Sequence, residues 1–141
     1  MLKVLVASDG SDNAVRAAAH VGSLARRGIS IEAVACNVQP PVMSGEVGVI
    51  ATVERAEQRR TRNASEALEA VARPLRESNV ALTFHEASGD AAVEIVAAAG
   101  ALRCDGIVLG CRGLGVVAGA VLGSVSAQVV RASPLPVTLV K

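Results

Sequence analysis

Aromatic residues are almost absent from this sequence of 141 residues, which contains no Trp, no Tyr and one Phe. Proteins that bind single-stranded nucleic acid stack the bases on aromatic side chains, and this chain has too few to build such a surface. An excess of charge of one sign is also lacking, because 14 basic and 13 acidic residues leave a net charge of +1. No field therefore builds up to attract nucleic acid or anionic lipid, and we expect neither as a partner.

Cysteines are few, and their spacing is not that of a disulfide framework or a metal site. Cys36, Cys104 and Cys111 form no CxxC pair, and their odd number argues against a set of disulfides. They indicate reduced thiols, and the opening run MLKVLVASDG is too short for a signal peptide, so we expect a cytoplasmic protein. Cys36 and Cys104 are expected in the core, whereas Cys111 falls in a glycine-rich loop where a redox role is conceivable.

Long hydrophobic runs are also scarce, with one exception. The stretch from Gly113 to Val130 carries no charged residue and has glycines at GxxxG spacing, so a membrane-associated protein with a Gly-rich helix at 113–130 is an alternative. Against it, the stretch is rich in Gly, Ala and Ser, and Arg112 stands at its start without a basic cluster to set orientation. We therefore favour a protein without a membrane span.

Apolar runs of strand type alternate with amphipathic helical patterns along the whole chain. Strands are predicted at 2–7, 29–38, 80–86, 106–109 and 137–140, and helices at 12–27, 54–78, 91–102 and 124–132. This order predicts right-handed crossovers and an α/β fold, a doubly wound, five-stranded parallel sheet with helices on both faces. No repeat or linker divides the chain, so we expect a single domain over 1–141. Ligands of such folds bind beyond the carboxyl ends of the strands, where the strand order reverses.

Two irregular features are expected within this pattern. The segment from Pro41 to Val53 is apolar without a clear period, which predicts a partly buried loop or flap. Pro74 lies inside the second predicted helix and removes a backbone hydrogen bond to the Ala70 carbonyl, which predicts a kink near the end of that helix.

The loop after the fourth predicted strand has the features of a phosphate-binding segment. It contains Gly110, Arg112 and Gly113 and ends at Gly123, where a helix opens. Glycines let backbone N–H groups approach an anion, and a helix N-terminus adds unpaired donors and a positive dipole end. Ser124 and Ser126 can add hydroxyl donors, and Arg112 could reach a terminal phosphate. The structural alternative is that these glycines serve tight turns and close helix packing.

The pattern G-x2-G-x9-G-S from Gly110 to Ser124 resembles the ATP-binding motif of the universal stress protein family. The opening KVLVASDGS, the segment SGDAAVEIV at 88–96 and the ending ASPLPVTLVK resemble that family too, in the right order and over the full length. The resemblance implies strand order 3-2-1-4-5, an adenine nucleotide alpha hydrolase-like fold. It also implies a role in the stress response and binding of ATP (or ADP/AMP), to which Mg²⁺ could be bound. The family further implies a homodimer formed through strand 137–140.

The resemblance also implies where the nucleotide binds. Ala7, Ser8 and Asp9 would lie near the base and ribose, and Val38 would contact adenine through its backbone. The phosphates would be lined by Gly110, Arg112, Gly113, Gly123, Ser124, Val125 and Ser126, with Leu109 at the strand end beside them. Asp9 has a plainer alternative as the cap of the first helix.

The sequence offers few residues that could form a catalytic site. The segment Gly123 to Ser126 does not match the G-x-S-x-G motif of hydrolases, and His20 and His85 have no evident partner. Asp9 and Glu86 could hold a metal or orient water at the strand ends. We therefore expect a nucleotide-binding module with at most slow hydrolysis, and a weak nucleotide hydrolase is the alternative.

Overall fold

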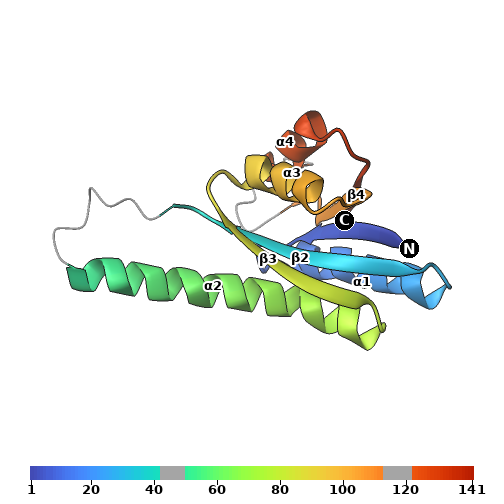
Figure 1. Ribbon diagram of the computed structural model, residues 1–141, viewed down its shortest axis with the longest axis horizontal. Coiled ribbons are helices and arrows are strands. Elements are labelled where there is room, and N and C mark those ends of the chain that lie inside the picture. The colour runs from blue at the N-terminus through green and yellow to red at the C-terminus, as the bar shows by residue number, and fades with distance from the viewer. Residues whose placement is uncertain (42–49, 113–121) are drawn as a thin grey trace.

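The computed structural model describes residues 1–41, 50–112 and 122–141. The elements follow in the order β1 (Leu2–Ala7), α1 (Asp12–Arg26), β2 (Ile31–Gln39), α2 (Ile50–Glu77), β3 (Ala81–Ser88), α3 (Ala91–Ala101), β4 (Gly106–Gly110), α4 (Ser124–Ala132) and β5 (Val137–Val140). The strands form one five-stranded parallel sheet of order β3-β2-β1-β4-β5. Its strands β2, β3 and β4 are labelled in Figure 1. The predicted doubly wound α/β fold and its strand order are confirmed.

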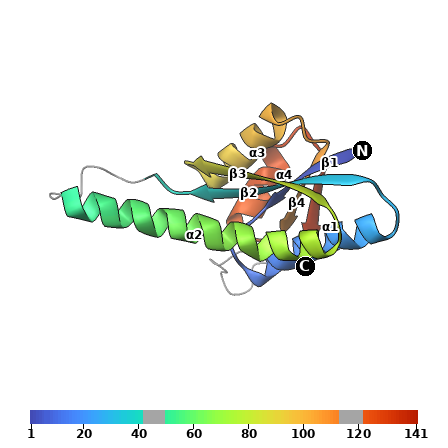
Figure 2. The same cartoon turned by 60° about the horizontal axis from the view of Figure 1, so that its bottom comes forward.

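The sheet separates two apolar cores. Helices α1 and α2 cover one face, and α3 and α4 cover the other (Figure 2). Alternate residues of β1 serve the two cores: Val4 and Val6 pack against α1 and α2, whereas Leu5 and Ala7 pack on the α3 side. A parallel sheet buried on both faces needs apolar residues at every strand position, which explains why β1 reads as one continuous hydrophobic run.

Turn and cap residues end the elements where the sequence predicts. The Ser11 hydroxyl caps α1 by accepting from the Ala14 N–H at 3.3 Å. Gly28, which follows α1, has φ of +95°, a left-handed conformation that glycine adopts without strain. Gly22 lets α1 approach α2 closely, because a Cβ at this position would collide with the Ser78 hydroxyl.

Helix α2 begins earlier than the sequence predicts. It starts at Ile50, so the last residues of the predicted flap belong to a helix; the remainder of the flap, 42–49, lies outside the described residues. Pro74 lies inside α2, which continues past it to Glu77. At 28 residues α2 is about 42 Å long, against about 30 Å for the nine-residue β2. Its N-terminal part therefore extends beyond the carboxyl ends of the strands (Figure 1).

The stretch considered as a membrane helix is not one long helix in its described part. Helix α4 begins at Ser124 and has nine residues, and 113–121 lie outside the described residues. Within the described ranges, no helix is long and apolar enough to cross a membrane.

Candidate functional site

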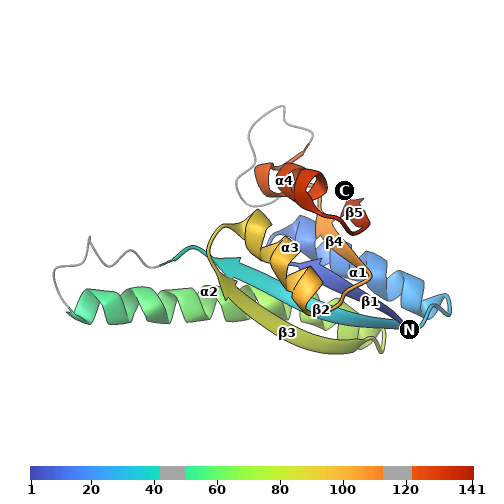
Figure 3. The ribbon, with the colours of Figure 1, turned by 45° about the horizontal axis from the view of Figure 1, so that its top comes forward.

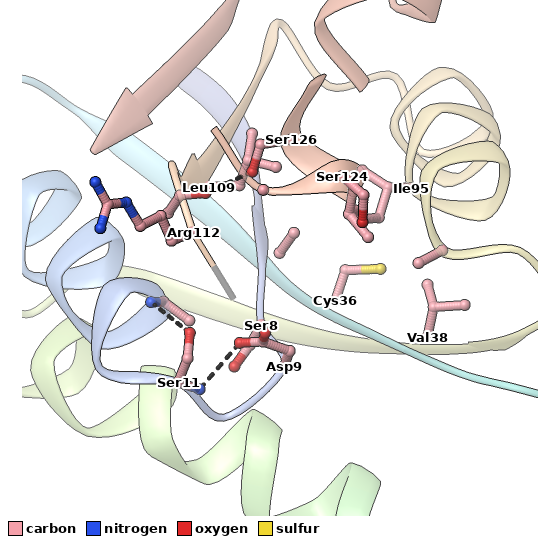
Figure 4. A pocket seen from close by; sticks show the side chains of 16 residues that line it. Ser8, Asp9, Ser11, Cys36, Val38, Ile95, Leu109, Arg112, Ser124 and Ser126 are labelled. Atoms are coloured by element: carbon pink, nitrogen blue, oxygen red, sulfur yellow. Dashed lines mark hydrogen bonds between the residues drawn. The ribbon is translucent and has the colours of Figure 1, made fainter. Parts of the chain in front are cut away.

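Helices α3 and α4 lie on one side of the sheet (Figure 3). On this side, at the carboxyl edge of the sheet, a cavity of about 220 Å³ opens (Figure 4). It lies where β1 and β4 end side by side, the point at which the strand order reverses and where doubly wound folds bind ligands. Its walls are formed by Ala7, Ser8, Asp9, Ser11, Ala14, Cys36, Val38, Ala91, Ile95, Leu109, Gly110, Arg112, Gly123, Ser124, Val125 and Ser126.

The fold brings together all predicted site residues that lie within the described part of the chain. The cavity is lined by the predicted residues Ala7, Ser8, Asp9, Val38, Leu109, Gly110, Arg112, Gly123, Ser124, Val125 and Ser126. The twelfth, Gly113, lies outside the described residues. Sequence reasoning missed five lining residues, which are Ser11, Ala14, Cys36, Ala91 and Ile95. Cys36 shares a face of β2 with Val38, and the first turns of α1 and α3 begin at the same edge of the sheet. The periodicity of these elements could therefore have indicated the missed residues.

One wall of the cavity is apolar. Cys36 and Val38 of β2 face Ile95 of α3 and Ser124 of α4 (Figure 4). Cys36 is fully buried, and this burial, reinforced by Cys104 and Glu94, raises its thiol pKa from 9.0 to about 12. The thiol is therefore neutral near pH 7 and acts as a small apolar side chain. Such a wall suits the flat, weakly polar surface of a heteroaromatic base.

The opposite side of the cavity is formed by the start of α4, which differs from two other helices that begin at this edge. Ser11 caps α1, and the Asp90 carboxylate caps α3 by accepting from the Val93 N–H at 3.1 Å. Helix α4 has Gly123 at its N-cap and no side-chain cap hydrogen bond. The first N–H groups of a helix have no intrahelical acceptor, so those of α4 are placed to donate to a ligand in the cavity.

Charge at the helix starts shows the same difference. The first turns of α1 and α3 contain Asp12 and Glu94, whose carboxylates offset the positive end of the helix dipole. The first turn of α4 contains no acidic residue. Of the three, α4 is the helix start best suited to hold an anion.

Backbone contacts join the two ends of the loop that precedes α4. The Gly123 N–H donates to the Cys111 carbonyl at 2.7 Å, and the Ser126 hydroxyl donates to the Gly110 carbonyl at 2.8 Å. The hydroxyl hydrogen of Ser126 is thus already used within the protein. This corrects the expectation that Ser126 donates to a phosphate through its side chain, and leaves the exposed Ser124 as the available hydroxyl.

Gly110 is required by packing. A Cβ on Gly110 would lie 2.6 Å from the Asn13 Cβ and 2.8 and 2.9 Å from the Asn13 carbonyl carbon and oxygen. Real Cβ atoms essentially never approach neighbours this closely, so helix α1 can lie against the end of β4 only because residue 110 has no side chain. Gly110 thus has the packing role that the structural alternative describes, and it also lines the cavity.

The turn after β1 is held by its own side chains. Asp9 accepts from the Ser11 N–H at 2.9 Å, but the cap of α1 is Ser11, so the cap interpretation of Asp9 is wrong. The Ser8 hydroxyl accepts from the Gly10 N–H at 3.2 Å and donates to the Ala67 carbonyl of α2 at 2.6 Å. These bonds fix the backbone at one wall of the cavity and tie it to α2.

Two other candidate groups lie apart from the centre of the cavity. The Arg112 side chain is exposed and extends toward α1, away from Ser124 (Figure 4). Glu86 does not line the cavity, since it lies on β3 with β2 between it and Asp9. The structure therefore does not bring Asp9 and Glu86 together. Over the described ranges, no cluster of three or more His, Cys, Asp or Glu side chains could hold a metal ion.

Comparison of the sequence with known proteins identifies the family of this chain. A model of the universal stress protein family matches residues 1–141. A protein of Thermus aquaticus, named universal stress protein in QAH/OAS sulfhydrylase 3′ region, is 36% identical over 139 residues, which cover 98% of this chain and 97% of that protein.

Solved structures share the fold. The crystal structure of a universal stress protein in complex with cAMP has a TM-score of 0.73 at 24% identity and covers 99% of this chain and 97% of that one. A universal stress protein family protein from Arabidopsis thaliana with AMP bound has a TM-score of 0.70 at 19% identity, with 100% and 92% of the two chains covered. Because the family model matches the whole chain and a named member is more than a third identical, this protein belongs to the universal stress protein family.

Proposed function

We propose that this protein is a binding module for adenine nucleotides, with the base against Cys36 and Val38 and the phosphates at the start of α4. The observation that carries the proposal is the helix start at Gly123, which lacks a side-chain cap and an acidic first turn and borders the cavity. Two proteins of the same fold are described with cAMP and with AMP bound, which supports an adenine nucleotide as the ligand.

The proposed ligand is ATP, ADP or AMP, held with at most slow hydrolysis. Asp9 is the only carboxylate among the described residues that line the cavity, and no His or Lys lines it there. General acid–base catalysis of phosphoryl transfer needs groups of that kind at the phosphates. Any Mg²⁺ that accompanies a triphosphate would be held mainly by the phosphate oxygens, with Asp9 as the nearest carboxylate of the cavity. In a cell the protein would act in the stress response by sensing or storing the nucleotide.

Purified protein should be stabilised by adenine nucleotides and should carry some through purification. At a hundred times its Kd, a ligand that binds only the native state stabilises it by about 2.7 kcal/mol, a rise of roughly 10 °C in Tm for a chain of this size. Because the chain lacks Trp and Tyr, absorbance at 260 nm reports bound nucleotide almost without protein background. Guanosine nucleotides are the matched control for the base, and adenosine for the phosphate. Unchanged melting with ATP, ADP and AMP at millimolar concentration, and no absorbance at 260 nm, would contradict the proposal.

We further propose a two-fold homodimer in which β5 pairs with its copy in antiparallel orientation. Among the described strands, β5 pairs only with β4, so its other edge can pair with a second copy. Pro136 precedes this short edge strand and Lys141 follows it. The expected result is a dimeric mass in light scattering at tens of micromolar protein. Thr138→Glu, at an exposed position of β5, should weaken the dimer because two copies would bring like charges together. A monomeric wild-type mass under these conditions would overturn the proposal.

A further inference from the structure

Asn37 is a polar residue in the buried part of the sheet. It lies on β2 with 2% of its surface exposed, two positions after the fully buried Ala35. Its amide nitrogen donates to the Ser8 carbonyl at 2.8 Å, and its side-chain oxygen accepts from the Gln39 side chain at 2.9 Å. Burial of an amide is unfavourable unless its groups are hydrogen-bonded, and here both are.

The amide of Asn37 continues the pairing of β1 with β2 beyond the point where the backbone leaves the sheet. The ladder ends at the pair Ala7 and Cys36, and the Ser8 N–H still donates to the Cys36 carbonyl at 2.8 Å. The next backbone group, the Ser8 carbonyl, is held by the Asn37 side chain. That carbonyl belongs to the peptide unit that joins Ser8 to Asp9, so Asn37 fixes the plane of the peptide at which the turn begins.

Asn37 itself does not line the nucleotide cavity. Cys36 and Val38 on either side of it do, because successive side chains of a strand point to opposite faces. Asn37 faces the side of the sheet covered by α1 and α2. Its influence on a ligand must therefore pass through the turn that carries Asp9.

We propose that Asn37 is a positioning residue for the nucleotide site, which holds the Ser8 carbonyl so that Asp9 and the start of α1 keep their place at the cavity wall. This inference rests on the proposed function. Gln39 acts one step further out, since its donation to the Asn37 oxygen selects the orientation of the amide in which nitrogen faces Ser8.

The test replaces Asn37 with leucine, which has nearly the same size and no charge but cannot donate to Ser8. We expect the Kd for AMP to rise at least tenfold, measured by titration calorimetry. In the same variant, amide hydrogen exchange at Gly10 and Ser11, followed by NMR, should become at least tenfold faster, because the turn loses its anchor. Faster exchange confined to this turn is a result that a general loss of stability would not give.

Two further variants separate positioning from stability. Ser78→Ala removes two hydrogen bonds of another buried side chain, at the far end of α2. The Ser78 hydroxyl donates to the Pro74 carbonyl at 2.9 Å and accepts from the Arg26 guanidinium. This variant should leave the Kd and the exchange at Gly10 and Ser11 unchanged. Gln39→Ala touches neither the cavity nor Ser8, and should raise the Kd about threefold by loosening the Asn37 amide. If Asn37→Leu does not fold, this milder variant tests the positioning role of Asn37 in its place.

The outcomes are distinct from those that test the proposed function. If wild-type protein binds no adenine nucleotide, the proposed function fails, and the exchange rates alone decide whether Asn37 holds the turn. If wild type binds but Asn37→Leu, or Gln39→Ala in its place, keeps the wild-type Kd and exchange rates, the positioning role is wrong. A loss of affinity equal to that of Ser78→Ala would also overturn it.

Discussion

Replacing Gly110 with alanine is expected to destabilise the native protein by about 3 kcal/mol. The added methyl group would meet the Asn13 Cβ and carbonyl group at 2.6 to 2.9 Å. Backbone atoms of a packed helix cannot turn aside as a flexible side chain can, so α1 would have to move away from the sheet. Urea unfolding followed by circular dichroism should show a lower midpoint with an unchanged slope.

Gly100→Ala is the matched control for this prediction. Gly100 lies in α3, and a Cβ there would meet nothing within 4 Å. Alanine should raise stability by about 0.5 to 1 kcal/mol, because it restricts the unfolded chain and favours the helix. If Gly110→Ala and Gly100→Ala had equal effects, the close contact of α1 with Gly110 would be refuted.

The second large effect is expected from Gly123→Asp, which should lower the affinity for AMP on the order of a hundredfold. Gly123 has φ of −68° and ψ of 158°, an extended conformation that any residue adopts, so the substitution introduces no backbone strain. A carboxylate at the N-cap would accept from the first N–H groups of α4 and repel a phosphate at the same place. Stability should stay the same or rise by up to about 1 kcal/mol for the same reason.

Gly123→Asn separates the charge from the cap. Asparagine caps a helix about as well as aspartate and has nearly the same shape, but it is neutral. We expect its loss of affinity to be several times smaller than that of Gly123→Asp and to depend less on salt. Equal affinity of wild type and Gly123→Asp for AMP would place the phosphate elsewhere and contradict the proposed binding mode. Calorimetric titration at two salt concentrations measures both quantities.

Local patterns in the sequence account for most of the fold. The run at Leu2–Ala7, the helical stripe that follows Ser11 and the cap at Asp90 depend on neighbouring residues alone, and each appears as predicted. The strand order 3-2-1-4-5 came from the family resemblance. The cavity residues after β1 and β4 could be predicted because parallel strands all end at one edge, so these residues meet whatever their distance in sequence. Val38 and Val125 came from the family resemblance.

Contacts between distant segments could not be predicted. Nothing near Gly110 in the sequence indicates that Asn13 fills the space of its missing side chain, and nothing near Ser126 shows that its hydroxyl bonds to Gly110. Asn37 looks like an interruption of an apolar strand until Ser8 is seen beside it. The sequence predicts a start for α2 later than the observed Ile50, because the first turn has no polar cap residue and its apolar residues resemble those of a buried loop.

The central position of β1 has a consequence for how this site comes into being. Strand β1 pairs with β2 close by in sequence, but its other neighbour is β4, and the Lys3 N–H donates to Asp105, 102 positions away, at 2.8 Å. Closing a chain segment of that length costs more configurational entropy than the local pairing of β1, β2 and β3, and contacts of such long range slow folding. Of the described residues, one wall of the cavity comes from 7–14 and another from 109–112 and 123–126, so the wall at β1 can form early in the folding of the chain. The cavity is complete only once β4 lies beside β1, so we expect it to be one of the last parts of the molecule to assemble.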